Sequence, residues 1–135
     1  MTVEIKGKYK GDLRVEITHG PSKSIIETDA PKDNNGKGER FSPTDMVVSA
    51  LGACMLTIMG IVAKRDGIKL EGVTFRGEKH MAENPRRIGK IVLEIFMPQG
   101  LNDQQKKKLE SAAHTCPVHK SIHPEIEQDI KFIYQ

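Results

Sequence analysis

The feature that most constrains this chain is an uncharged run over residues 46–63, which occupies 18 of its 135 residues. Ser42 and Pro43 precede the run and are typical of a helix N-cap and a first helical position. A basic pair follows the run, and Gly67 comes directly after the next acidic residue. Cations in a last turn and a glycine just beyond it are typical of a helix end. The pattern predicts one long helix from Ser42-Pro43 to about Gly67.

An apolar helix of this length either crosses a membrane or is covered by protein on every side. The soluble alternative is favoured, because small and polar residues interrupt the run and no aromatic residues flank it. Ser49, Ala53 and Gly60 form a stripe that lets another helix approach closely. A chain with 4% aromatic residues has little with which to cover such a helix alone. We therefore expect a second copy of the chain to pack on it as a symmetric homodimer.

The length predicts a single domain over residues 1–135. Lys and Arg number 21 against 18 Asp and Glu, a net charge of +3, and the basic residues are scattered. Nucleic-acid binding is not expected, because it needs a concentrated basic patch. The first ten residues are charged and lack the apolar segment of a signal peptide, so a cytoplasmic location and reduced thiols are expected.

Alternating and helical patterns elsewhere predict an α+β fold. The expected elements are a two- or three-stranded antiparallel meander within 2–28, a surface loop over 29–40, the long helix, paired strands over 71–79 and 88–97, a helix over 102–114, a short helix over 117–122 and a last strand over 127–134.

Two cysteines stand 62 residues apart, Cys54 in the middle of the long helix and Cys116 just before Pro117. Cys54 shares a helical face with apolar residues, so it is either a small buried hydrophobe or a reactive thiol. Cys116 is expected at the N-cap of a short helix or at an adjacent position, where free amides favour a thiolate. It either packs there or does chemistry.

Histidines around the second cysteine raise the alternative of a zinc site. His114, Cys116, His119 and His123 are all possible zinc ligands. Their spacing matches no established zinc signature, and a second ligand cluster is missing from the sequence. No metal or other cofactor is therefore expected.

Both cysteines lie in motifs that resemble the OsmC/Ohr family of osmotically induced and organic hydroperoxide resistance proteins. Residues 41–54 read FSPTDMVVSALGAC, and residues 115–122 read TCPVHKSI. A PRRIGKI stretch and the C-terminal strand follow the family's order, so the resemblance covers essentially the whole chain. It implies an OsmC-like intertwined homodimer with long central helices.

The resemblance also implies a thiol peroxidase that reduces organic hydroperoxides. Cys54 would attack the peroxide and become a sulfenic acid, and Cys116 would resolve it as a disulfide. An external thiol, of dihydrolipoyl type in better-studied relatives, would regenerate the pair. No nucleic acid or membrane partner is implied.

One position departs from the hydroperoxide-resistance branch. That branch has a glutamate ten residues before the attacking cysteine, paired with an arginine from the N-terminal strands, and here the position is Thr44. The candidate substitutes are Asp45 and Arg14, the arginine of the predicted N-terminal strands. The departure places the chain nearer the less characterised OsmC-like branch. It also leaves open a binding protein of the same fold, with passive cysteines and a lipid-like or thioester ligand.

Overall fold

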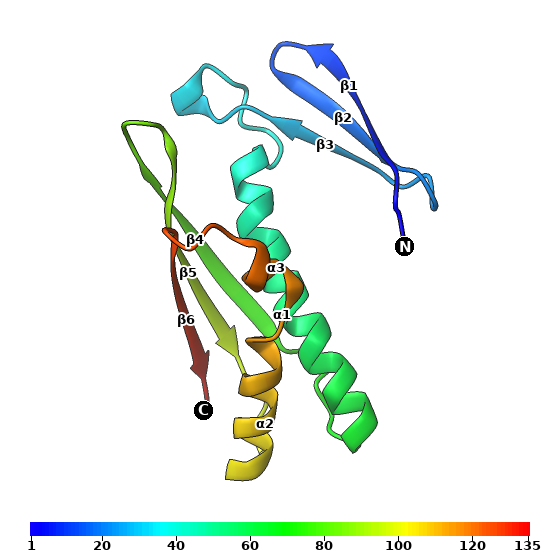
Figure 1. Ribbon diagram of the computed structural model, residues 1–135, viewed down its shortest axis with the longest axis vertical. Coiled ribbons are helices and arrows are strands. Elements are labelled where there is room, and N and C mark those ends of the chain that lie inside the picture. The colour runs from blue at the N-terminus through cyan, green and yellow to red at the C-terminus, as the bar shows by residue number, and fades with distance from the viewer. The chain divides into compact units, whose positions relative to one another are not determined.

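The computed structural model describes residues 1–135 and divides them into two compact units, Met1–Met46 and Val47–Gln135. The boundary falls within the first turn of the long helix α1 (Pro43–Asp66). The single domain over residues 1–135 stays a prediction. The mixture of helices and antiparallel strands confirms the predicted α+β class (Figure 1).

The first unit is a three-stranded antiparallel meander in the order β1-β2-β3. Its strands are β1 (Ile5–Gly11), β2 (Arg14–His19) and β3 (Ile25–Asp29), followed by a short 3-10 helix, η1 (Lys32–Asn34). The predicted surface loop began at Asp29. That residue instead ends β3 and is only 1% exposed, because it pairs with an arginine on the neighbouring strand.

The meander is amphipathic. Register places Ile5 and Tyr9 of β1 on the same side as Val15 and Ile17 of β2 and Ile26 of β3, while lysines of β1 alternate onto the other side. Ile5 is 64% exposed and Tyr9 63% exposed. One side of this sheet is therefore an apolar surface that the single chain leaves open to solvent.

The second unit packs helices on a sheet in the order β4-β5-β6 (Figure 1). Its remaining elements are β4 (Thr74–Ala82), β5 (Arg87–Phe96), α2 (Asp103–Ala113), α3 (Pro117–Ser121) and β6 (Glu127–Ile133). The antiparallel β4-β5 pair is confirmed, although β4 begins at Thr74 because residues 71 and 72 form a turn. β6 joins the sheet parallel to β5, after the α2-α3 crossover.

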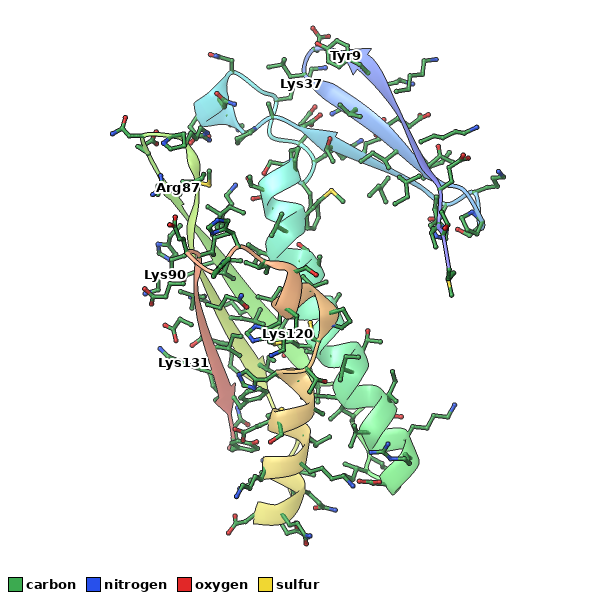
Figure 2. The ribbon with its side chains drawn as sticks, viewed as in Figure 1. Tyr9, Lys37, Arg87, Lys90, Lys120 and Lys131 are labelled. Atoms are coloured by element: carbon green, nitrogen blue, oxygen red, sulfur yellow. The ribbon has the colours of Figure 1, made fainter.

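The core of this unit lies between α1 and the inner side of β5. Leu51, Met55 and Met59 of α1 are completely buried, as are Ile91 and Leu93 of β5. Lys90 and Lys131 project from the opposite side of the sheet, away from the helices (Figure 2). The alternation of buried and charged residues along β5 follows the two-residue period of a strand that is covered on one side.

Two glycines let α1 lie very close to β4. A Cβ added at Gly52 would stand 2.6 Å from Cζ of Phe75, and one added at Gly77 would stand 2.7 Å from Cγ1 of Val48. Real Cβ atoms do not approach other atoms this closely, so both contacts require glycine.

By length and composition, α1 could cross a membrane. Its most apolar window has a mean hydropathy of 2.2, and 39% of that window is buried within the chain. The buried residues lie along one side, whereas Ala50, Ala53, Thr57 and Ile61 form an exposed strip along the other. A core helix of a soluble protein passes the same test, and the exposed strip is the part that needs a further partner.

Candidate active site

The helix that carries Cys54 is fixed at its start by a capping box. Ser42 Oγ accepts from the N–H of Asp45 at 3.1 Å, and Asp45 Oδ2 accepts from the N–H of Ser42 at 2.9 Å. These reciprocal bonds satisfy two amides that a helix start leaves free. The structure therefore gives Asp45, one of the four predicted site residues, a capping role, nine positions before Cys54 in the helix.

Cys116 is brought to its position by the short helix α3. It is the N-cap of α3, as predicted, and Pro117 occupies the first turn. The N–H of His119 donates to Cys116 Sγ at 3.3 Å. The sulfur thus takes the place of the usual oxygen cap of a helix.

Cys54 lies near enough to Cys116 to raise the pKa of the Cys116 thiol. Cys116 is completely buried, whereas Cys54 is half-buried on α1, and neither is in a disulfide. A molecule arriving from solvent can therefore reach Cys54 but not Cys116. Because of this difference in access, Cys54 suits the role of the attacking thiol, and Cys116 suits that of a thiol that reacts only with Cys54.

The environment of Cys116 favours the neutral thiol. Burial raises its pKa, and the neighbouring Cys54 raises it further. The backbone N–H groups of His119 and Val118 act in the opposite direction, because they donate to the sulfur. Cys116 is thus protonated at rest but sits where amides can stabilise a thiolate.

A glutamine that sequence reasoning missed anchors α3 to the sheet. His119 Nδ1 donates to Gln128 Oε1 on β6, and Gln128 Nε2 donates to the His119 carbonyl at 3.4 Å. The ring of His119 also meets that of His114 edge-on, with centroids 5.6 Å apart. The sequence carries no signal for this anchor, because the pairing of β6 with β5 was not predicted.

The histidines are held by other bonds and do not gather round a metal. His119 Nδ1 is hydrogen-bonded to Gln128 Oε1, and His123 Nδ1 accepts from the N–H of Glu125. No group of three or more His, Cys, Asp or Glu side chains has a geometry that could hold a metal ion. The spacing of His114, Cys116, His119 and His123 does not produce a zinc-binding cluster.

Arg14, the remaining predicted site residue, lies in the first unit and is bound there by two carboxylates. Its Nε donates to Asp29 Oδ1 at 2.7 Å and its Nη2 to Asp29 Oδ2 at 2.9 Å. Nη2 also donates to Glu39 Oε1 at 3.1 Å. Sequence reasoning missed Asp29, although Arg14 and Asp29 are direct cross-strand neighbours and opposite charges favour that arrangement.

Comparison with known proteins places this geometry in a family. The model of the OsmC-like protein family matches residues 36–131, which include both cysteines. The chain belongs to the OsmC-like family.

The relatives share the fold over nearly their whole length. A Psychrobacter arcticus crystal structure, provisionally described as an osmotic stress induced and detoxification response protein, is 46% identical. It covers 98% of this chain and 96% of its own, with a TM-score of 0.93. An organic hydroperoxide resistance protein OsmC of Legionella pneumophila shares the fold at 19% identity, with a TM-score of 0.76 over 98% and 96% of the two chains. An uncharacterized protein of Acinetobacter baylyi is 26% identical over 111 residues, 80% of this chain and 77% of that protein.

Proposed function

We propose that the protein is a thiol-dependent peroxidase that reduces organic hydroperoxides with Cys54 and Cys116. The observation that carries the proposal is a pair of neighbouring thiols, Cys54 half-buried on α1 and Cys116 completely buried. A sulfenic acid formed on Cys54 would be attacked by the neighbouring Cys116 sulfur, which closes the disulfide. Family relatives described as organic hydroperoxide resistance proteins support the same chemistry.

The surroundings of Cys54 support an organic peroxide as the substrate. Along one face of α1, Cys54 lies between Val47 and Ile58, which are half-buried apolar residues one helical turn or two away. An alkyl or aryl group can bury apolar area on this face, whereas hydrogen peroxide cannot. The substrate class proposed is therefore an alkyl or aryl hydroperoxide.

The proposed cycle needs an external dithiol. Attack by the Cys54 thiolate releases an alcohol, and Cys116 closes the disulfide with loss of hydroxide. Two electrons from a dithiol, of dihydrolipoyl type by family resemblance, reopen it. A cytoplasmic location suits this step, because that compartment keeps thiols reduced.

We further propose that the working form is an intertwined homodimer. The open side of the β1-β2-β3 sheet and the exposed strip of α1 are apolar surfaces that a lone chain leaves in water. Contiguous apolar areas of this kind mark interaction surfaces in soluble proteins. A second copy is the partner that we propose for these surfaces, since each chain offers both.

Arg14 and Asp45 remain proposed site residues. Arg14→Gln should slow peroxide reduction if the guanidinium assists the thiolate, and Arg40→Gln is the matched control. Asp45→Asn keeps an oxygen for the Ser42 amide while removing the charge. A loss of turnover without a change in Tm in that variant would assign the carboxylate to the reaction.

A coupled assay with cumene hydroperoxide and dihydrolipoamide tests the function. Wild type should consume peroxide catalytically, Cys54→Ser should not, and Cys116→Ser should stop after one turnover with oxidised Cys54. If the wild-type protein consumes no peroxide and Cys54 resists oxidation, the cysteines are passive. Native mass spectrometry would then be used to find a bound lipid-like or thioester ligand.

A further inference from the structure

The helix-facing side of β6 begins with a polar side chain. Register pairs Gln128 with Ile91 of β5, which is completely buried, so both side chains point towards the helices. The next two residues on that side of β6, Ile130 and Phe132, are apolar and pack against the core. A glutamine at the head of an apolar stripe needs partners for its amide, because an unsatisfied polar group beside a core is costly.

Gln128 finds both partners on one residue of α3. Its Oε1 accepts from His119 Nδ1, and its Nε2 donates to the His119 carbonyl at 3.4 Å. An amide oxygen can only accept, so the proton of the neutral His119 ring lies on Nδ1. The two bonds hold the side chain and the main chain of His119 at once.

The residue that Gln128 holds is also the one whose backbone contacts the second cysteine. The N–H of His119 donates to Cys116 Sγ at 3.3 Å. The helix that carries this N–H, α3, has five residues, and none of them is fully buried. A helix this short has little stability of its own. The position of the amide relative to the sulfur therefore depends on contacts outside the helix, and the bonds from β6 are such contacts.

We propose that Gln128 is a positioning residue for Cys116, because it holds His119 so that the amide of that residue stays directed at the sulfur. The inference rests on the proposed function and goes beyond it, since it assigns a role in disulfide closure to a side chain on β6 rather than to a cysteine. Groups that react must be held in place by side chains whose own positions are fixed by further hydrogen bonds.

This arrangement serves the second step of the proposed cycle. The Cys116 sulfur attacks the sulfur of Cys54–SOH, the S–S bond forms, the S–O bond breaks, and the leaving hydroxide takes up the Cys116 proton as water. Over both steps the hydroperoxide gains two electrons and the two thiols lose two, with an alcohol and water as products. A donor held at the Cys116 sulfur stabilises the negative charge that develops there as the proton leaves. The first step, attack of Cys54 on the peroxide, does not use this donor.

Two substitutions separate positioning from packing. Gln128→Met removes both hydrogen bonds and keeps a side chain of similar length, whereas Gln128→Glu keeps an oxygen that accepts from His119 Nδ1. Gln104→Met, the same change on the exposed side of α2, is the matched control. Trapping with dimedone gives the rate at which cumene hydroperoxide forms the Cys54 sulfenic acid. Rapid alkylation and peptide mass spectrometry without the trap give the rate of disulfide closure.

We expect Gln128→Met to close the disulfide about fivefold more slowly than wild type, the effect of one net hydrogen bond, and to form sulfenic acid at an unchanged rate. Gln128→Glu should restore most of the closure rate, and Gln104→Met should match wild type. Closure at the wild-type rate in Gln128→Met would overturn the positioning role and leave the peroxidase intact. A wild type that forms neither sulfenic acid nor disulfide would overturn both proposals.

The variants also distinguish positioning from a general effect on the fold. A fall in both rates in Gln128→Met, or closure in Gln128→Glu no faster than in Gln128→Met, would assign the residue to packing and overturn the proposal. The rise of the closure rate with pH should move to higher pH in Gln128→Met, because the amide of His119 favours the Cys116 thiolate by lowering its pKa. Packing alone would leave this profile in place.

A measurement on the wild-type protein covers the case of variants that fail to fold. A long-range ¹H–¹⁵N spectrum of the reduced protein at alkaline pH, where imidazole is neutral, should show His119 as the Nδ1–H tautomer. The Nε2–H tautomer would mean that Nδ1 does not donate to Gln128, and it would contradict the proposal.

Discussion

Arg14 and Asp29 form a two-point ion pair across β2 and β3, with N–O distances of 2.7 and 2.9 Å. The Asp29 side chain is 1% exposed, and the N–H of Glu39 donates a further bond to Oδ2 at 3.1 Å. The hydrogen bonds from Arg14 lower the pKa of Asp29 to about 2. The first residue of the loop predicted as a surface segment is therefore an anchor of the N-terminal unit.

This pair predicts a loss of stability in acid. The pKa of Asp29 is lower in the folded chain than the roughly 3.9 of an unfolded one. The carboxylate therefore contributes fully to the free energy of unfolding above pH 4, and this contribution disappears as the pH falls towards 2. Asp29→Asn should lower Tm by several degrees at pH 7 and should remove the part of the fall in Tm between pH 4 and 2 that Asp29 causes. Asp12→Asn is the matched control, since Asp12 is exposed in a turn. Thermal unfolding of the three proteins between pH 2 and 7 tests the expectation, and an identical acid limb in Asp29→Asn would contradict it.

The close approach of α1 to β4 predicts that Gly52→Ala destabilises the fold despite the better helix propensity of alanine. The new methyl would collide with the ring of Phe75, and overpacking of this kind costs about 1–3 kcal/mol. Chemical denaturation measures the change in the free energy of unfolding.

A double-mutant cycle shows whether the ring is the cause. Gly52→Ala combined with Phe75→Leu should be less destabilising than the sum of the two single changes. Strict additivity would mean that the methyl group and the ring do not meet.

Much of the fold follows from local signals in the sequence. Ser42-Pro43 and Asn102 begin helices because capping is a short-range effect, and both helices start at the residues expected. The cysteine pair was predicted from two family-like motifs, and its role stays a prediction, although Cys54 contributes to the raised pKa of Cys116. What local signals could not provide were long-range pairings. The parallel pairing of β6, and with it the contact of Gln128 with His119, depends on where a crossover returns.

The exposed strip of α1 predicts a dimer that a single charge can weaken. Ile61 is 58% exposed in the single chain, and Ile61→Glu would bury a carboxylate if a second copy covers it. Sedimentation velocity should show wild type as a dimer and Ile61→Glu shifted to monomer. Gln104→Glu, an equal change of charge on the exposed side of α2, should stay dimeric. A monomeric wild type would contradict the proposed assembly.

The contact of Tyr134, which directly follows β6, with α2 predicts a loss of stability in alkali. Tyr134 Oη donates to Glu110 Oε2 at 2.5 Å, and Lys106 Nζ lies 4.6 Å from the centre of its ring. Burial raises the pKa of Tyr134, and the bond to Glu110 raises it further. Stability should therefore hold up to about pH 10, the pKa of a free tyrosine, and fall above it.

Tyr134→Phe tests this contact directly. The variant should lose about 1 kcal/mol of the free energy of unfolding at pH 7, the net value of one hydrogen bond. It should also lack the fall in stability above about pH 10. If the variant loses stability above about pH 10 as the wild type does, another group causes the alkaline transition.

The most direct test of the account is the fate of the two thiols when reduced protein meets one equivalent of cumene hydroperoxide. Peptide mass spectrometry after rapid alkylation should find a disulfide between Cys54 and Cys116 and a matching amount of cumyl alcohol. Recovery of both cysteines fully alkylated, with the peroxide unconsumed, would contradict it.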